Sequence, residues 1–125
     1  MRSKIHGRIT NAELEVLSIL WSRGPSTVRK VHNAVTKLRE VCYTTTLKKL
    51  QVMSGKGIVK RNETGKAHVY EATFDREETQ RSILGDLVER VFNGSVVDLM
   101  AVALSATNSP EELVEIRLLL DQVDE

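Results

Sequence analysis

The chain of 125 residues has a single cysteine and lacks any long apolar run. Because Cys42 stands alone, a disulfide within the chain is ruled out, and a reducing compartment is indicated. The longest unbroken apolar run, Leu99–Leu104, is far shorter than the roughly 20 residues that a membrane-spanning helix needs. Met1–Thr10 has no apolar core of the kind found in secretion signals. We therefore expect a cytoplasmic protein that does not insert into a membrane.

The sequence is also poor in the residue groups that carry catalysis or hold metals. His6, His32 and His68 lie far apart, and Cys42 has no His or Cys at a spacing typical of zinc sites. Gly55-Lys56-Gly57 lacks the additional glycine and the Ser or Thr of a phosphate-binding loop. The sequence predicts neither an enzyme nor a bound cofactor or metal ion.

Charge is abundant and unevenly distributed. Residues 1–73 contain 14 Lys and Arg against 5 Asp and Glu, a formal balance of +9. Residues 74–125 contain 4 against 12, a balance of −8, so the overall value of +1 conceals two oppositely charged halves. A basic half favours a polyanionic partner, and an acidic half disfavours one. This division predicts two domains, residues 1–73 and residues 74–125.

Capping motifs and apolar periodicity predict three helices in the basic half. The expected N-caps and helix ranges are Thr10 for 11–22, Ser26 for 27–38 and Thr44 for 45–54. The apolar stripe of the second helix is expected to end at Leu38. Two short strands, 58–61 and 68–73, follow around a polar turn. Three helices followed by a β-hairpin are typical of a winged helix-turn-helix.

The acidic half is predicted to form three more helices, over about 76–92, 95–106 and from Pro110 onward. The middle helix has a single charge, Asp98, and a helix that is apolar on nearly all sides must be buried on nearly all sides. Three short helices cannot provide that burial alone, so we expect two chains to pair through them. The fold class is therefore mainly α with a small β-hairpin, a winged head followed by a dimerisation segment. The expected dimer contacts are Leu84, Leu87, Val88, Val91, Val97, Met100, Leu104, Ile116 and Leu120.

The helix over 45–54 is the candidate for reading DNA, because a B-DNA major groove accepts one helix whose first residues reach base edges. Thr hydroxyls can bond to bases or phosphates, and Lys side chains can neutralise phosphates. The expected contacts, including the hairpin, are Tyr43, Thr44, Thr45, Lys48, Lys49, Arg61, Lys66 and His68. Tyr70 is expected to pack against the helix instead. The alternative is a winged-helix module that binds protein and no DNA.

Two segments resemble the penicillinase-repressor (BlaI/MecI/CopY) family. They are Ala12–Leu17 followed by Leu20-Trp21, and Tyr43–Gln51 followed by Lys56–Val59, within a similarity that covers about residues 8–124. The resemblance implies a dimeric winged-helix repressor that binds a palindromic operator. It also implies operator contacts through Thr44, Thr45 and Lys48, with Lys66 and the wing on the DNA backbone. Leu47 replaces a basic contact residue of some relatives, so a different operator sequence is expected.

The resemblance leaves the mode of release open. Some family members are cut by a membrane metalloprotease at an Asn-Phe bond in the dimerisation segment, and the corresponding stretch near Val102-Ala103 has no such pair. Copper-responsive members end in Cys-x-Cys, which is absent here. We expect release when the dimer is disrupted, with a membrane-bound sensor metalloprotease as one candidate partner.

Overall fold

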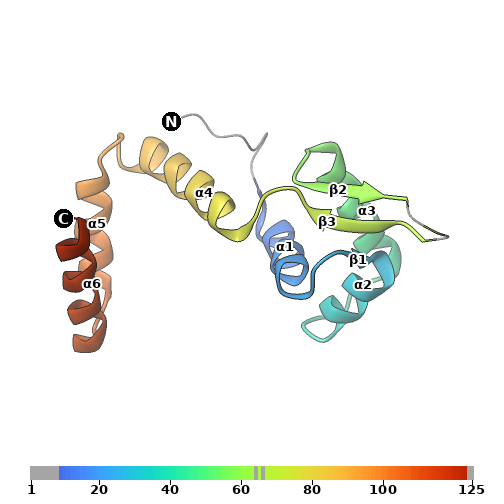
Figure 1. Ribbon diagram of the computed structural model, residues 1–125, viewed down its shortest axis with the longest axis horizontal. Coiled ribbons are helices and arrows are strands. Elements are labelled where there is room, and N and C mark those ends of the chain that lie inside the picture. The colour runs from blue at the N-terminus through green and yellow to red at the C-terminus, as the bar shows by residue number, and fades with distance from the viewer. Residues whose placement is uncertain (1–8, 64, 66, 124–125) are drawn as a thin grey trace. The chain divides into compact units, whose positions relative to one another are not determined.

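A computed structural model describes residues 9–63, 65 and 67–123. In these residues the chain forms nine elements: α1 (Asn11–Arg23), β1 (Ser26–Thr27), α2 (Val28–Thr36), α3 (Tyr43–Gly55), β2 (Val59–Asn62), β3 (Val69–Ala72), α4 (Arg76–Val91), α5 (Val96–Ala106) and α6 (Pro110–Val123) (Figure 1). The chain divides into two compact units, a head that ends at Ile83 and a C-terminal unit that begins at Leu84. This division falls within α4. The domain boundary that the charge pattern places at 73/74 stays a prediction.

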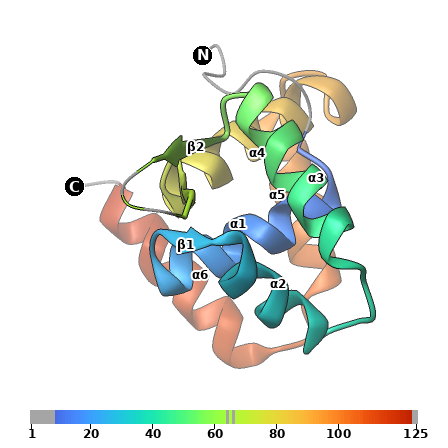
Figure 2. The same ribbon diagram turned by 90° about the vertical axis from the view of Figure 1, so that its right-hand side faces the viewer.

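The fold is mainly α with a small antiparallel sheet, which confirms the predicted fold class. Strands β2 and β3 form the hairpin, with Arg61 opposite Tyr70. Strand β1 pairs with the other edge of β3, with Ser26 opposite Tyr70, so the strand order is β1-β3-β2. This third strand was not predicted. Figure 2 views the head with α2 and α3 joined by the Lys37–Cys42 connection.

The head buries its apolar side chains in one core drawn from α1, α2, α3 and the sheet. The buried members are Val16, Leu17, Leu20, Val28, Val31, Val35, Leu50, Met53, Ile58, Val59 and Tyr70. Helices α1 and α3 supply Val16, Leu17, Leu20, Leu50 and Met53 to this core. Tyr70 is 2% exposed, which confirms that it packs inside and leaves it no ring face for stacking on a sugar.

Two helix starts carry capping boxes, and the one at α1 confirms Thr10 as the predicted N-cap. At the start of α1, the Thr10 amide donates to Glu13 Oε1 at 2.9 Å and the Glu13 amide donates to Thr10 Oγ1 at 3.1 Å. At the start of α4, the Asp75 amide donates to Glu78 and the Glu78 amide donates back to Asp75. Each box satisfies two amides that a helix start leaves unpaired.

The predicted start and end of the second helix are wrong. Ser26 is buried in β1, where its hydroxyl donates to the Gly24 carbonyl at 2.9 Å. Thr27 is the N-cap of α2 and accepts a hydrogen bond from the Lys30 amide at 3.2 Å. The helix ends at Thr36, so Leu38 lies outside the apolar stripe and is 62% exposed. The pairing of Ser26 with β3 accounts for the shifted start, and a local sequence pattern does not reveal that pairing.

The predicted cap of the third helix is also wrong. The N-cap of α3 is Cys42, and its side chain makes no capping hydrogen bond. Tyr43 and Thr44 therefore belong to the first helical turn. The helix begins two residues earlier than predicted, because the Cys42 carbonyl accepts hydrogen bonds from the Thr45 and Thr46 amides.

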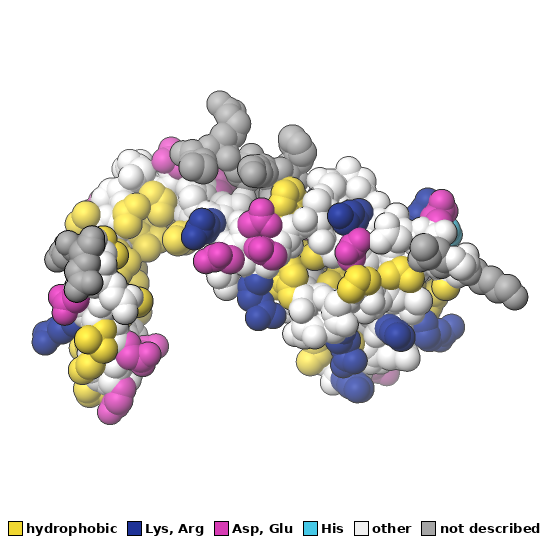
Figure 3. Space-filling model, in the orientation of Figure 1, with side chains coloured by type: hydrophobic (Ala, Val, Ile, Leu, Met, Phe, Trp, Pro, Cys, Tyr) yellow, Lys and Arg dark blue, Asp and Glu magenta, His cyan; other side chains and the backbone are white. Residues whose placement is uncertain are grey.

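Helices α5 and α6 contain no buried residue in the single chain. Figure 3 shows hydrophobic side chains gathered along this part of the surface. The exposed large apolar side chains of α5 and α6 are Val96, Val97, Val102, Leu104, Leu113, Val114, Leu118, Leu119, Leu120 and Val123. None of the described helices is both long and apolar enough to cross a membrane.

Candidate nucleic-acid interface

Helix α3 has one face in the core and the opposite face in solvent. Thr46, Leu50 and Met53, at i, i+4 and i+7, share the buried face. On the outward face, Thr44, Lys48 and Gln51 are exposed at i, i+4 and i+7. The buried face fixes the helix to the head, so the outward face presents a hydroxyl, an ammonium and an amide in a fixed arrangement.

Two neighbouring lysines of α3 have different surroundings. Lys48 is exposed, whereas Lys49 is partly buried on the side of the helix that faces Glu13. The charge of Lys49 contributes to lowering the pKa of the Glu13 carboxyl. The structure therefore places Lys48 with Thr44 and places Lys49 nearer α1.

A buried ion pair connects the start of α1 with the end of α3. The Glu13 side chain is 2% exposed, and Lys56 Nζ donates to both of its carboxylate oxygens at 3.0 Å. Burial alone would raise the pKa of Glu13, but the hydrogen bond from the Thr10 amide and the ammonium of Lys56 outweigh it, so the pKa is lowered. The carboxylate thus stays charged at neutral pH and holds the far end of the candidate reading helix.

The hairpin carries several of the predicted phosphate contacts. Arg61 and His68 are both about half exposed, and each lies close to the same carboxylate, Glu63 Oε1, at 3.6 Å from Arg61 Nη2 and 3.4 Å from His68 Nδ1. Lys66 lies outside the described residues. The exposed Lys60 precedes Arg61 on β2. Figure 3 shows several Lys and Arg side chains on the visible face of the head.

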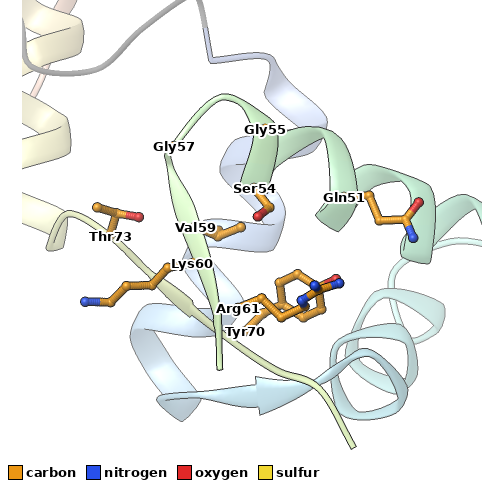
Figure 4. A pocket seen from close by; sticks show the side chains of 9 residues that line it. All are labelled: Gln51, Ser54, Gly55, Gly57, Val59, Lys60, Arg61, Tyr70 and Thr73. Carbon is orange, nitrogen blue, oxygen red and sulfur yellow. The ribbon is translucent and has the colours of Figure 1, made fainter. Parts of the chain in front are cut away.

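A shallow groove runs between the C-terminal half of α3 and the hairpin (Figure 4). Its lining residues are Gln51, Ser54, Gly55, Gly57, Val59, Lys60, Arg61, Tyr70 and Thr73. Gln51 from the helix and Arg61 from β2 both border it, so the outward face of α3 continues into the basic hairpin. Gly57 lies at φ +80°, a backbone conformation that favours glycine, and this turn leads directly from the helix into β2.

The exposed predicted interface residues are thus divided between α3 and the hairpin. The first half of α3 carries Tyr43, Thr44, Thr45 and Lys48, and the Tyr43 side chain is about one third exposed. Arg61 and His68 lie on the hairpin. Sequence reasoning missed Gln51, although its spacing from Thr44 and Lys48 gives it the same face. Leu47 is partly buried against the core and is less available for a base contact than its sequence position suggested.

The predicted dimer contacts lie mostly on the surface of the single chain. Exposed members are Leu84, Leu87, Val91, Val97, Leu104 and Leu120, and those of intermediate exposure are Met100 and Ile116. Val88 is the exception, because it is already 7% exposed within the chain. Its neighbours on α4, and not Val88 itself, therefore offer apolar area to a partner.

Comparison with known proteins identifies relatives over most of the chain. A family model described as penicillinase repressor matches residues 9–122. Two proteins named "Transcriptional regulator BlaI", from Mycobacterium tuberculosis strains CDC 1551 / Oshkosh and ATCC 25618 / H37Rv, are each 35% identical over 80 residues. The similar region covers 63% of this chain and 58% of each relative. Neither the family description nor the name of these relatives denotes an enzyme.

Proposed function

Because the chain belongs to the penicillinase repressor family, we propose that it represses transcription by binding a palindromic operator as a homodimer. The outward face of α3 enters the major groove, and the β2–β3 hairpin lies along the neighbouring phosphates. The observation that carries this proposal is the outward face itself, where Thr44, Lys48 and Gln51 are exposed together on a helix anchored by its opposite face.

The chemistry of this face suits a DNA duplex. The Gln51 amide can donate one hydrogen bond to an adenine edge and accept one from it, and Lys48 can bind guanine or a phosphate. Thr44 and Thr45 at the first turn can bond to bases or backbone oxygens. On the hairpin, Arg61 and the cations beside it can bind phosphates. Such contacts carry no sequence information, but they fix the position of the protein along the duplex.

The second chain is proposed from the apolar surface of the C-terminal unit. No residue of α5 or α6 is buried, yet the only charge on α5 is Asp98. Water contact with so many Val and Leu side chains is unfavourable, and an exposed apolar surface of this kind is typical of a protein interface. A second copy presents the same surface, so a two-fold axis pairs each apolar stripe with its equivalent. Two heads then meet two half-sites separated by about one DNA turn or a multiple of it.

Release follows from this arrangement. A single head makes half of the operator contacts, so any event that separates the chains lowers affinity steeply. Cleavage within the C-terminal unit by a partner protease is one such event, and a small signal that binds the dimer is another.

The test is a titration of a labelled DNA fragment, taken from upstream of the gene for this chain, with the full chain. Fluorescence anisotropy reports binding at several salt concentrations. We expect log K to fall linearly with log[salt], because phosphate contacts release counterions. A scrambled fragment of equal length is the control and should bind at least about a thousandfold more weakly. Absent or salt-independent binding would favour the alternative, a module that binds protein.

A further inference from the structure

The first residue of α3 is held by two side chains of α2. The guanidinium carbon of Arg29 lies 4.7 Å from the centroid of the Tyr43 ring. The ring of His32 meets the same ring edge-on, with centroids 5.4 Å apart and planes at 76°. A cation over the ring and an aromatic edge against it are both favourable geometries. Neither Arg29 nor His32 is among the residues assigned to DNA above.

His32 also reaches the next turn of α3. Its Nδ1 lies 3.1 Å from Thr46 Oγ1, and Thr46 is only 4% exposed. Tyr43 and Thr46 are three residues apart, so they share one face of the helix. His32 therefore contacts α3 at two points three residues apart, Tyr43 and Thr46, and these points bracket Thr44 and Thr45.

The N-cap of α3 does not stabilise the helix start through its side chain. The N-cap, Cys42, makes no side-chain hydrogen bond, whereas α1 and α2 are capped by Thr10 and Thr27. A side-chain cap is a usual source of stability for a helix start. In α3 that source is replaced by contacts from α2.

We propose that Arg29 and His32 form a clamp on Tyr43 and Thr46 that sets the orientation of the DNA-reading end of α3. This inference rests on the proposed function, because it assigns the clamp to base discrimination. Arg29 and His32 are positioning residues: they act on the bases through Thr44 and Thr45. Hydrogen bonds to base edges require a fixed orientation of the side chains that make them. Contacts to phosphates contribute mainly electrostatic attraction, which depends less on orientation. Loosening the clamp therefore lowers sequence discrimination and leaves the salt dependence of binding intact.

The test compares three variants of the full chain, Arg29→Gln, His32→Ala and the control Lys30→Gln, which removes a neighbouring exposed charge. Binding to the operator fragment and to the scrambled fragment is measured across salt concentrations. For Arg29→Gln and His32→Ala we expect the ratio of the two affinities to fall by about tenfold, with an unchanged salt slope. For Lys30→Gln we expect an unchanged ratio.

Two outcomes would overturn the clamp. One is an Arg29→Gln variant whose salt slope falls by about 0.9 while both fragments lose affinity equally, which would make Arg29 an ordinary phosphate contact. The other is an unchanged affinity ratio in His32→Ala.

A second readout needs no DNA and separates this inference from the proposed function. In the free protein, the Thr45 and Thr46 amides should exchange with solvent about three to ten times faster in both clamp variants. Amides of α1, such as that of Leu17, should keep their protection and so show that the variants are folded. Unchanged exchange at Thr45 and Thr46 would overturn the clamp, whereas failure of the unmodified chain to bind either fragment would overturn the proposed function alone.

Discussion

The head buries most of its large apolar side chains, whereas helices α5 and α6 of the C-terminal unit leave theirs exposed. In the head, Leu17, Leu50 and Tyr70 are at most 2% exposed and belong to one core. In the C-terminal unit, Val97 is 77% and Leu120 is 58% exposed, and no residue of α5 or α6 is buried. The head completes its core within one chain. Helices α5 and α6 have the apolar content of a core without the burial, and this difference is the observation behind the proposed dimer.

The largest expected effect is on the head core. Leu50→Ala should lower the free energy of unfolding by about 2–5 kcal/mol, because it removes a fully buried side chain and leaves a cavity. Val52→Ala, on the exposed side of the same helix, is the matched control and should cost less than about 1 kcal/mol. Urea denaturation followed by circular dichroism, at one protein concentration, measures both. Equal costs would mean that the core of the head is not what stabilises it.

The second prediction concerns the C-terminal unit. Leu120→Glu should weaken the proposed dimer by at least about thirtyfold, because it places a carboxylate in the apolar interface. Glu115→Gln on the same helix is the control and should leave the dimer intact. Size-exclusion elution over a range of concentrations reports the shift. A later elution for both variants, or for neither, would contradict the assignment of this face of α6.

The third prediction tests the ion pair that joins α1 to α3. Lys56→Gln should destabilise the head by about 1–3 kcal/mol, because it leaves the buried Glu13 carboxylate without its ammonium partner. Glu13→Gln should cost less, since Lys56 is 30% exposed and can reach water. Urea midpoints of the two variants provide the comparison. The opposite order would mean that the buried carboxylate is not the group that depends on the pair.

The same pair predicts a pH dependence with a definite sign. The pKa of Glu13 is lowered in the folded state, so its stabilising effect is present above the ordinary glutamate pKa of about 4.3 and is lost as the pH falls through the lowered value. Unfolding free energies of the unmodified chain and of Glu13→Gln should therefore converge between neutral pH and about pH 3. A constant difference over this range would show that the pKa is not lowered.

The fourth prediction separates the two adjacent lysines of α3. Lys48→Ala should weaken operator binding by about tenfold and reduce the salt slope by about 0.9, because Lys48 lies on the outward face. Lys49→Ala should weaken it only about twofold, since Lys49 faces Glu13. Anisotropy titrations on the same fragment compare them. A larger loss in Lys49→Ala would place the reading face on the other side of the helix.

The smallest expected effect is at the hairpin. Glu63 lies against both Arg61 and His68, so it competes with DNA phosphates for them. Glu63→Gln should tighten binding to operator and scrambled fragments alike by about twofold, as expected for an exposed ion pair. Weaker binding in this variant would mean that Glu63 orders the hairpin for DNA.

Much of the head was predictable because its signals are local. The Thr10 cap of α1 and the shared face of Thr46, Leu50 and Met53 follow from spacing alone, and both are present. Strand β1 was missed because two residues carry no periodicity, and only their pairing with Val69 and Tyr70 makes them a strand. That pairing also displaced the predicted cap from Ser26 to Thr27.

The candidate interface was predictable in part for a similar reason. The exposure of Thr44 and Lys48 follows from helical spacing. The difference between Lys48 and Lys49 does not, because it depends on the position of Glu13 in another helix. The contacts of Arg29 and His32 with Tyr43 likewise depend on how α2 packs against α3. The roles of these residues on DNA stay predictions.

The contrast between a self-sufficient head and an incomplete C-terminal unit is tested most directly by the mass of the unmodified chain in solution. Static light scattering at micromolar concentrations should give twice the 14.0 kDa mass of one chain. The mass should return toward 14.0 kDa only on strong dilution. A mass of 14.0 kDa throughout the micromolar range would contradict the account, because the apolar surface of α5 and α6 would then remain in water in the functional protein.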